Sequence, residues 1–169
     1  MSKTNSSAQR ASNSAEGNNY VDMHTVGLGY LSRVREVPVR KGPSFTSASI
    51  SAFHGEKGVN DGLTYVPFDV KAASEQAAQV LKQFETQAND RNCKVMVRFK
   101  IGDQYIDSYT ITKGDRAGQT GMVLKGRLLF VSHVWVKAQG ASSYALAYEY
   151  VKPDSQASAP SENRDGTHG

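Results

Sequence analysis

The chain has 169 residues but only one cysteine and one tryptophan, and it contains no long run of apolar side chains. Cys93 has no partner for an internal disulfide, which excludes a disulfide-stabilised scaffold and fits a reducing compartment. No stretch approaches the roughly 18 apolar residues of a membrane-spanning helix. Residues 1–19 also lack the apolar run of a secretory signal. We therefore expect a cytoplasmic protein with no membrane partner.

The sequence also lacks the residue spacings that would indicate an enzyme. Its four histidines are widely spread, and no Gly-x-Ser-x-Gly, His-Glu-x-x-His or P-loop lysine motif occurs. Residues 114–121 (GDRAGQTG) are glycine-rich, but they lack a Lys-Ser/Thr ending and lead into a strand pattern. We expect no catalytic activity, no metal site and no cofactor.

Charge and apolar residues are unevenly distributed along the chain. The net charge of +4 divides into +1 for residues 1–19, +5 for residues 20–152 (17 Lys and Arg against 12 Asp and Glu) and −2 for residues 153–169. Both terminal segments are too poor in apolar side chains to offset the entropy cost of ordering. We therefore expect two disordered tails around one domain, residues 20–152.

Alternating patterns typical of strands dominate this domain. They cover residues 21–37, 45–53, 63–70, 94–101, 105–112 and 121–136, with a further run at 144–151. A single amphipathic helix is predicted within 71–90, where Ser74 or Asp69 caps the start. The order β-β-β-α-β-β predicts an all-β fold with one helix, an OB-fold-like five-stranded barrel with an extended hairpin between its last two strands. A half-open β-sandwich with one helix is the alternative.

Local signals refine this prediction. Gly27 and Gly29 indicate a bulge or a tight bend in the first strand, and Gly102-Asp103 indicates a short turn. Pro67 suggests that the third strand lies at an edge or is broken there. The expected core aromatics are Phe84, Phe99, Phe130 and Trp135.

Basic residues recur at i and i+2 on the predicted strands, so the two members of each pair share a face. Single-stranded nucleic acid is held by such cations on its phosphates and by aromatic rings that stack on its bases. Cations on exposed strands also serve simply to block edge pairing. The candidate phosphate contacts are Arg33, Arg35, Lys100, Lys113, Arg116, Lys125 and Arg127. The candidate stacking residues that accompany them are Tyr30, Phe45, Tyr105 and Tyr109.

Two blocks carry a family resemblance. Residues 22–37 read D-x-H-T-x-G-x-G-Y-L-x-R-x-R-E-V, and residues 99–132 contain FKIGD, KGDRAGQTG and LKGRLLFVS. They resemble a family of small replication-associated proteins carried by bacterial integrative and conjugative elements. More distantly, the domain resembles the bacterial single-stranded DNA-binding protein, which implies two further stacking residues, Tyr65 and Phe68. The acidic, Phe-ended tip of that protein has no counterpart, because this chain ends RDGTHG.

Together these observations predict single-stranded DNA binding in replication or transfer of a mobile element. About five neutralised phosphates would give a salt slope of roughly −3.5. The alternative is a module that docks on a replication or conjugation protein. Residues 144–151 either add a sixth strand to the same barrel or extend a sheet across a homo-oligomer.

Overall fold

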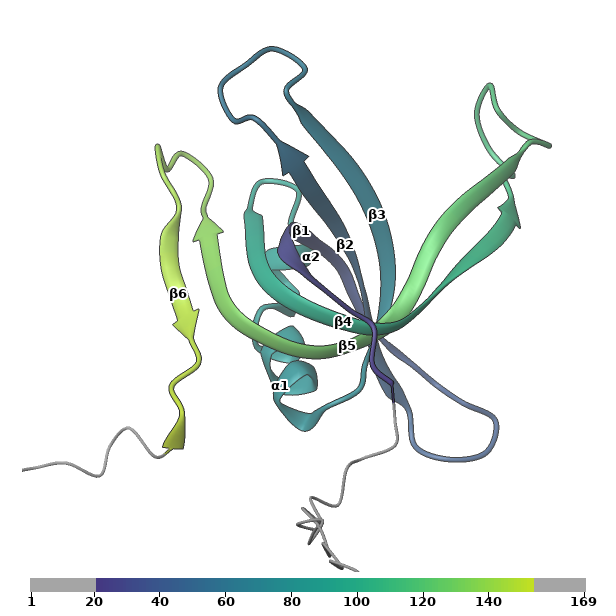
Figure 1. Ribbon diagram of the computed structural model, residues 1–169, viewed down its shortest axis with the longest axis horizontal. Helices are drawn as coiled ribbons and strands as arrows, with labels where there is room; N and C mark the ends of the chain where they lie inside the picture. Colours follow the sequence, from purple (N-terminus) through teal and green to yellow (C-terminus); the bar gives the residue numbers. More distant parts are fainter. Residues whose placement is uncertain (1–20, 154–169) are drawn as a thin grey trace, which may run out of the picture.

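The computed structural model describes residues 21–153, which form three strands, two short helices and three further strands (Figure 1). The strands are β1 (His24–Val37), β2 (Phe45–Gly55), β3 (Leu63–Ala72), β4 (Lys94–Thr110), β5 (Thr120–Lys137) and β6 (Ala145–Glu149). The helices α1 (Glu75–Gln83) and α2 (Glu85–Asn89) lie between β3 and β4. The disorder expected for the two tails concerns residues outside this range, apart from Pro153.

The strands pair in the order β3-β2-β1-β4-β5-β6, and a parallel pairing between β3 and β5 closes the barrel. β1 pairs with β2 on one side and β4 on the other, while the helices lie between β3 and β4 in sequence. This is the connectivity of an OB-fold, so the predicted class is confirmed. The β2–β3 and β4–β5 hairpins extend away from the barrel and diverge (Figure 1).

Alternate residues of the strands fill the barrel, and the helices cover the remaining apolar surface. The core includes Ile50, Val70, Val97, Phe99 and Leu128 from the strands, together with Val80, Leu81, Phe84 and Ala88 from the helices. Phe99 and Phe84 are therefore buried as predicted. Phe130 and Trp135 are only half-buried, because the inward positions of β5 are taken by Val131 and Val134. The prediction that these two aromatics belong to the core was wrong.

The glycines of β1 allow a close approach between strands. Gly27 and Gly29 remain in regular pairing with Phe99 and Ala52, and the bulge falls instead at Arg33, whose φ is 48°. A Cβ on Gly29 would lie 2.6 Å from Ile50 Cγ2, so only glycine lets β1 pack this near to β2. The position of the bulge is a correction to the sequence-based expectation.

Gly102 and Asp103 form an irregularity within β4, where a turn was expected. Residues 94–101 and 105–110 belong to one strand because both halves pair with β5, and the register shifts between Gly102 and Tyr105. Pro67 lies at an edge, as predicted. β3 pairs with β2 along one side, but its parallel pairing with β5 on the other side starts only at Phe68, so that side of β3 is unpaired at Pro67.

The predicted helix is divided in two at Phe84, whose φ and ψ are −104° and 12°. Ser74 caps α1 as expected, with its Oγ accepting a hydrogen bond from the Ala77 N–H at 3.1 Å. Gln76 and Asn89 then fix the helices to the barrel. The Gln76 amide donates to the carbonyl of Val131 and accepts from its N–H. The Asn89 amide makes the same two hydrogen bonds with Val34.

The run at residues 144–151 contributes a sixth strand of the same chain. β6 pairs antiparallel with the end of β5, outside the closed barrel, and Tyr148 packs against the core. Its Tyr148 hydroxyl also accepts a hydrogen bond from Gln76 at 2.9 Å. Neither helix within residues 21–153 is long and apolar enough to cross a membrane.

Candidate nucleic-acid interface

Three aromatic rings meet on the outer surface of β1, β2 and β3. The ring centroids of Tyr30 and Phe53 lie 5.3 Å apart, those of Tyr30 and Tyr65 6.5 Å, and those of Phe53 and Tyr65 6.3 Å. Tyr65 is 51% exposed, and the other two rings are half-buried. We call Tyr30, Phe53 and Tyr65 the aromatic cluster.

Strand alternation places the aromatic cluster outside the barrel. Tyr30 lies between the inward positions 29 and 31, and Phe53 follows Ala52, which packs against the core. Phe53 pairs directly with Tyr65, so the rings share one face of the sheet. Sequence reasoning proposed Tyr30 and Tyr65 but missed Phe53. The signal was present, because Phe53 has the opposite parity to Ala48, Ile50 and Ala52.

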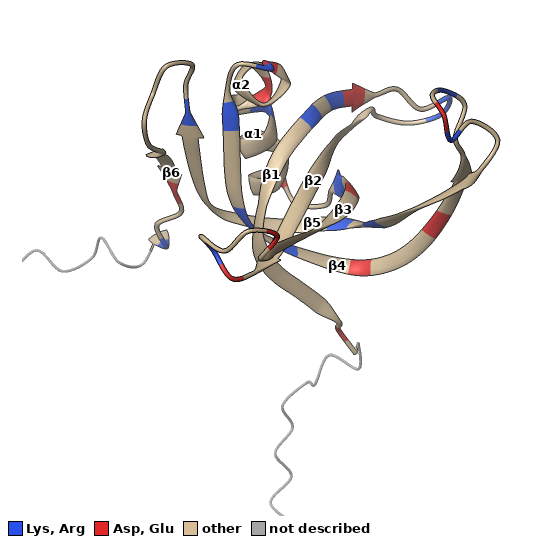
Figure 2. Ribbon diagram, turned by 90° about the horizontal axis from the view of Figure 1, so that it is seen from above, with Lys and Arg blue, Asp and Glu red and all other residues tan. Residues whose placement is uncertain are grey.

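Four cations surround the aromatic cluster. Lys94 Nζ lies 5.6 Å from the Tyr30 ring centroid, Arg98 pairs with Leu28 beside the cluster, and Lys57 and Arg33 line hollows next to Phe53 and Tyr30. Within residues 21–153, none of the four forms an ion pair with a carboxylate. Lysines and arginines occur on several strands and loops rather than in one stripe (Figure 2).

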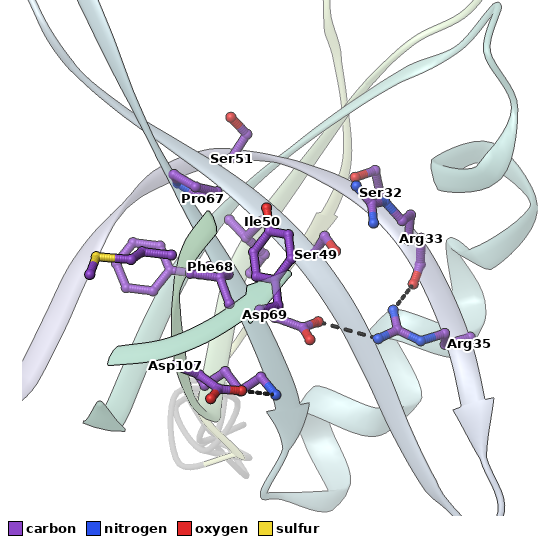
Figure 3. Close-up of a pocket in the computed structure, with 14 residues that line it drawn as sticks. Ser32, Arg33, Arg35, Ser49, Ile50, Ser51, Pro67, Phe68, Asp69 and Asp107 are labelled. Atoms are coloured by element: carbon purple, nitrogen blue, oxygen red, sulfur yellow. Dashed lines mark hydrogen bonds and ion pairs between the residues drawn. The ribbon is translucent and has the colours of Figure 1, made fainter. Parts of the chain in front are cut away.

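A groove of about 520 Å³ separates the β1–β3 surface from the β4–β5 hairpin (Figure 3). Its walls include the hydroxyl residues Ser32, Ser49 and Ser51 and two ion pairs. Arg35 Nη2 lies 3.4 Å from Asp69 Oδ1, and Lys125 Nζ lies 2.7 Å from Asp107 Oδ2. Two of the predicted phosphate contacts are therefore already neutralised by carboxylates.

The contact between Lys125 and Asp107 shifts the pKa of both groups. A hydrogen bond from Lys125, followed by its charge, lowers the pKa of Asp107. The same hydrogen bond raises the pKa of Lys125. Both groups are therefore ionised throughout the neutral range, and their charges cancel within the groove.

The remaining predicted cations lie away from the aromatic cluster. Arg127 Nη1 lies 2.9 Å from Asp103 Oδ2. Lys113 and Arg116 are exposed at the hairpin tip, where Arg116 donates to Gln119 at 3.3 Å. Lys100 is half-buried on β4, in register with Val26 and Phe130. The structure therefore places only Arg33 of the seven predicted cations close to the aromatic cluster.

Among the predicted aromatics, Phe68 is 5% exposed and belongs to the core. Its ring packs at 6.1 Å from that of Phe99, because position 68 has the inward parity of Val66 and Val70. Phe45 lies under Lys71, whose Nζ is 4.3 Å from the ring centroid. Tyr105 and Tyr109 are exposed on the hairpin, near Lys125 and over Gly121. The stacking role expected for Phe68 is incompatible with its burial.

A further tyrosine reaches the aromatic cluster from the segment between β5 and β6. Burial, and then a hydrogen bond with Tyr30, raises the pKa of Tyr144 to about 12. Lys137 Nζ also lies 5.9 Å from the Tyr144 ring centroid. No sequence spacing pointed to this contact, because it depends on how β6 folds back along β5.

The geometry defines a class: an OB-fold-like barrel with an exposed aromatic cluster on its outer face, an arrangement compatible with nucleic-acid binding. Residues 14–147 match the family DUF3577, described as protein of unknown function. The chain belongs to this family. No curated protein matches it.

Proposed function

We propose that this protein binds single-stranded DNA across the outer face of β1, β2 and β3. The observation that carries the proposal is the aromatic cluster with its flanking cations, Arg33, Lys57, Lys94 and Arg98. Aromatic faces stack on unpaired bases of any sequence, and cations neutralise the phosphates between them. No base pairing or catalysis is needed for this mode of binding.

The sequence resemblance supports a biological role for such binding. The blocks at residues 22–37 and 99–132 resemble small replication-associated proteins of integrative and conjugative elements. We therefore propose that the DNA is an intermediate in replication or transfer of a mobile element. Single strands arise in both processes, and a protein that coats them without sequence preference would serve either one.

Titration of fluorescently labelled oligo-dT with the full chain, read by anisotropy across a salt series, tests the proposal. If the four flanking cations each contact a phosphate, log K falls against log salt with a slope of about −2.8. Absence of binding at micromolar protein and about 50 mM salt would contradict the proposal.

Two tyrosine variants locate the binding face. Each stacked base contributes about 1–3 kcal/mol, so Tyr65→Ala should weaken oligo-dT binding by roughly 5- to 150-fold. Tyr105→Ala is the matched control, because Tyr105 is similarly exposed, at 58% against 51%, but lies on the β4–β5 hairpin. Equal losses for both variants would contradict a site centred on the aromatic cluster.

A protein partner is the second candidate function, favoured by the β4–β5 hairpin. Ile106 and Met122 are 68% and 69% exposed there, and large exposed apolar side chains are typical of contact surfaces. Ile106→Ser combined with Met122→Ser should abolish capture of a replication or conjugation protein while leaving oligo-dT affinity unchanged. Reduced oligo-dT affinity would instead assign the hairpin to DNA.

A further inference from the structure

A pocket of about 560 Å³ adjoins the aromatic cluster. Leu28 of β1, Phe53 of β2 and Met96 of β4 form its apolar walls, and Tyr144 lines it from the segment before β6. The strand register brings these walls together, because Leu28 pairs with both Phe53 and Arg98, and Tyr30 pairs with Met96. The pocket lies within the size range of sites that enclose small organic ligands.

Positive charge lies at this pocket without a matching carboxylate. Lys57 and Arg98 are both exposed and line it, together with His54. None of the residues that line the pocket is an aspartate or a glutamate. The groove beside the hairpin differs, because Asp69 and Asp107 neutralise two of its three cations, Arg35 and Lys125. A ligand with an apolar, planar body and a negative group would match both the apolar walls and the positive charge of the pocket.

Tyr144 is held in place as one wall. It lines the pocket together with Tyr30, and Lys137 Nζ lies 5.9 Å from its ring centroid. Because β6 pairs with β5 next to this residue, the β5–β6 segment is anchored on both sides of the contact. The five-stranded barrel alone would leave the pocket open on this side.

We propose that this pocket receives a single unstacked base of the bound strand, with its phosphate held by Arg98 and Lys57. The inference rests on the proposed function, and it assigns the pocket a role distinct from stacking on the aromatic cluster. The base lies between the side chains of Met96 and Tyr144 and is removed from the stack that continues over Tyr30, Phe53 and Tyr65. A planar ring buries apolar surface there, and the uncompensated cations attract the phosphate.

Methyl NMR of the full chain with ¹³C-labelled methionine methyl groups tests the inference. The chain has four methionines, of which Met96 lines the pocket and Met122 lies on the hairpin. On saturation with oligo-dT, the Met96 methyl should shift and show nuclear Overhauser effects to thymine protons, while Met122 should show none. Met96→Leu assigns the resonance.

The possible outcomes separate the two proposals. If anisotropy reports binding but Met96 shows no shift and no thymine contact, the pocket assignment is wrong and the proposed function stands. If oligo-dT does not bind at all, both fail, and the pocket would be left to an apolar side chain of a protein partner. A Met96 shift accompanied by contacts to thymine supports both.

Variants at Tyr144 provide an independent check. Tyr144→Ala removes the wall and should reduce oligo-dT affinity by about tenfold, the effect of losing one base contact. Tyr150→Ala, just beyond the C-terminal end of β6 and against Phe130, is the matched control and should bind as the wild type. Tyr144→Phe keeps the ring and should keep the thymine contact to Met96. Loss of the thymine contact to Met96 in Tyr144→Phe would contradict the proposal that the Tyr144 ring forms a wall of the base pocket.

Discussion

Lys125 and Asp107 face each other across the β4–β5 hairpin, with Nζ and Oδ2 2.7 Å apart. The same relationship recurs at Arg127–Asp103 and Arg35–Asp69, at 2.9 and 3.4 Å. Each pair joins two different strands. The hairpin and its groove therefore carry less available positive charge than their lysines and arginines suggest, so we expect binding to concentrate on the aromatic cluster.

Replacing Asp107 by asparagine should strengthen oligo-dT binding. The substitution leaves Lys125 without its carboxylate partner, so the lysine becomes available to a phosphate. One further phosphate contact makes the slope of log K against log salt more negative by about 0.7. Anisotropy titrations between about 50 and 200 mM salt measure this change.

Glu75→Gln is the matched control, because it makes the same change in net charge on α1, away from the grooves. It should leave the salt slope unchanged. If Asp107→Asn and Glu75→Gln raise affinity equally, the gain reflects net charge alone and Lys125 takes no part.

Trp135 should report binding through its fluorescence. Tyr30 pairs with Met96 and Met96 pairs with Trp135, so these side chains form one row across the outer face of β1, β4 and β5. The indole stacks on His133, with centroids 5.4 Å apart and planes within 9°. A DNA strand that crosses the pocket will reach this row of side chains. The fluorescence emission of Trp135 should therefore fall as oligo-dT saturates the protein.

Because Trp135 is the only tryptophan, the signal needs no deconvolution. Trp135→Phe should abolish the signal while anisotropy still reports binding. Saturation by anisotropy with constant emission in the wild type would show that the strand stops before β5.

The barrel was predictable because alternation of apolar residues is local information. Ala48, Ile50 and Val70 follow it, and the element order then leaves few topologies. The same alternation assigns Phe68 to the core, since Val66 and Val70 share its parity. Placing Phe68 on the surface followed the family resemblance against that signal, and the buried ring shows that the alternation was the better guide.

Which lysines and arginines are paired with carboxylates was not predictable, because the pairing depends on strand register. Lys125 and Arg127 share a face at i and i+2, but their partners come from β4 across a register shift. The bulge at Arg33 also changes the relation between Arg33 and Arg35. Tyr144 reaches Tyr30 only through the fold of β6, which no spacing along the chain encodes.

Titration should identify Tyr144 by its late ionisation. Its pKa of about 12 in the folded state lies above the ordinary value near 10, so the folded protein binds its proton more tightly than the unfolded chain. The stability from this residue is complete below pH about 10 and is lost as the pH rises through about 12. Absorbance of the phenolate, followed alongside circular dichroism, should show a late ionisation step near pH 12.

Tyr144→Phe should remove that late step and make stability less dependent on pH between about 10 and 12. Tyr109→Phe, at an exposed hairpin position, serves as the control and should leave the step in place. A late step that survives in Tyr144→Phe would belong to another tyrosine.

Asn89 should be the residue through which α2 stabilises β1. The bulge at Arg33 leaves Val34 without a strand partner on β2, and Asn89 replaces that partner with two hydrogen bonds of 2.9 Å. Asn89→Ala leaves the buried Val34 N–H and C=O unsatisfied, which should lower the free energy of unfolding by about 1–3 kcal/mol. Asn89→Asp, ionised at neutral pH, keeps the acceptor and loses the donor, so its effect there should be intermediate. Urea unfolding followed by circular dichroism measures the series, with Asn92→Ala, an exposed neighbour, as the control. Equal midpoints for Asn89→Ala and Asn92→Ala would show that water satisfies Val34 and that the bulge does not depend on the helix.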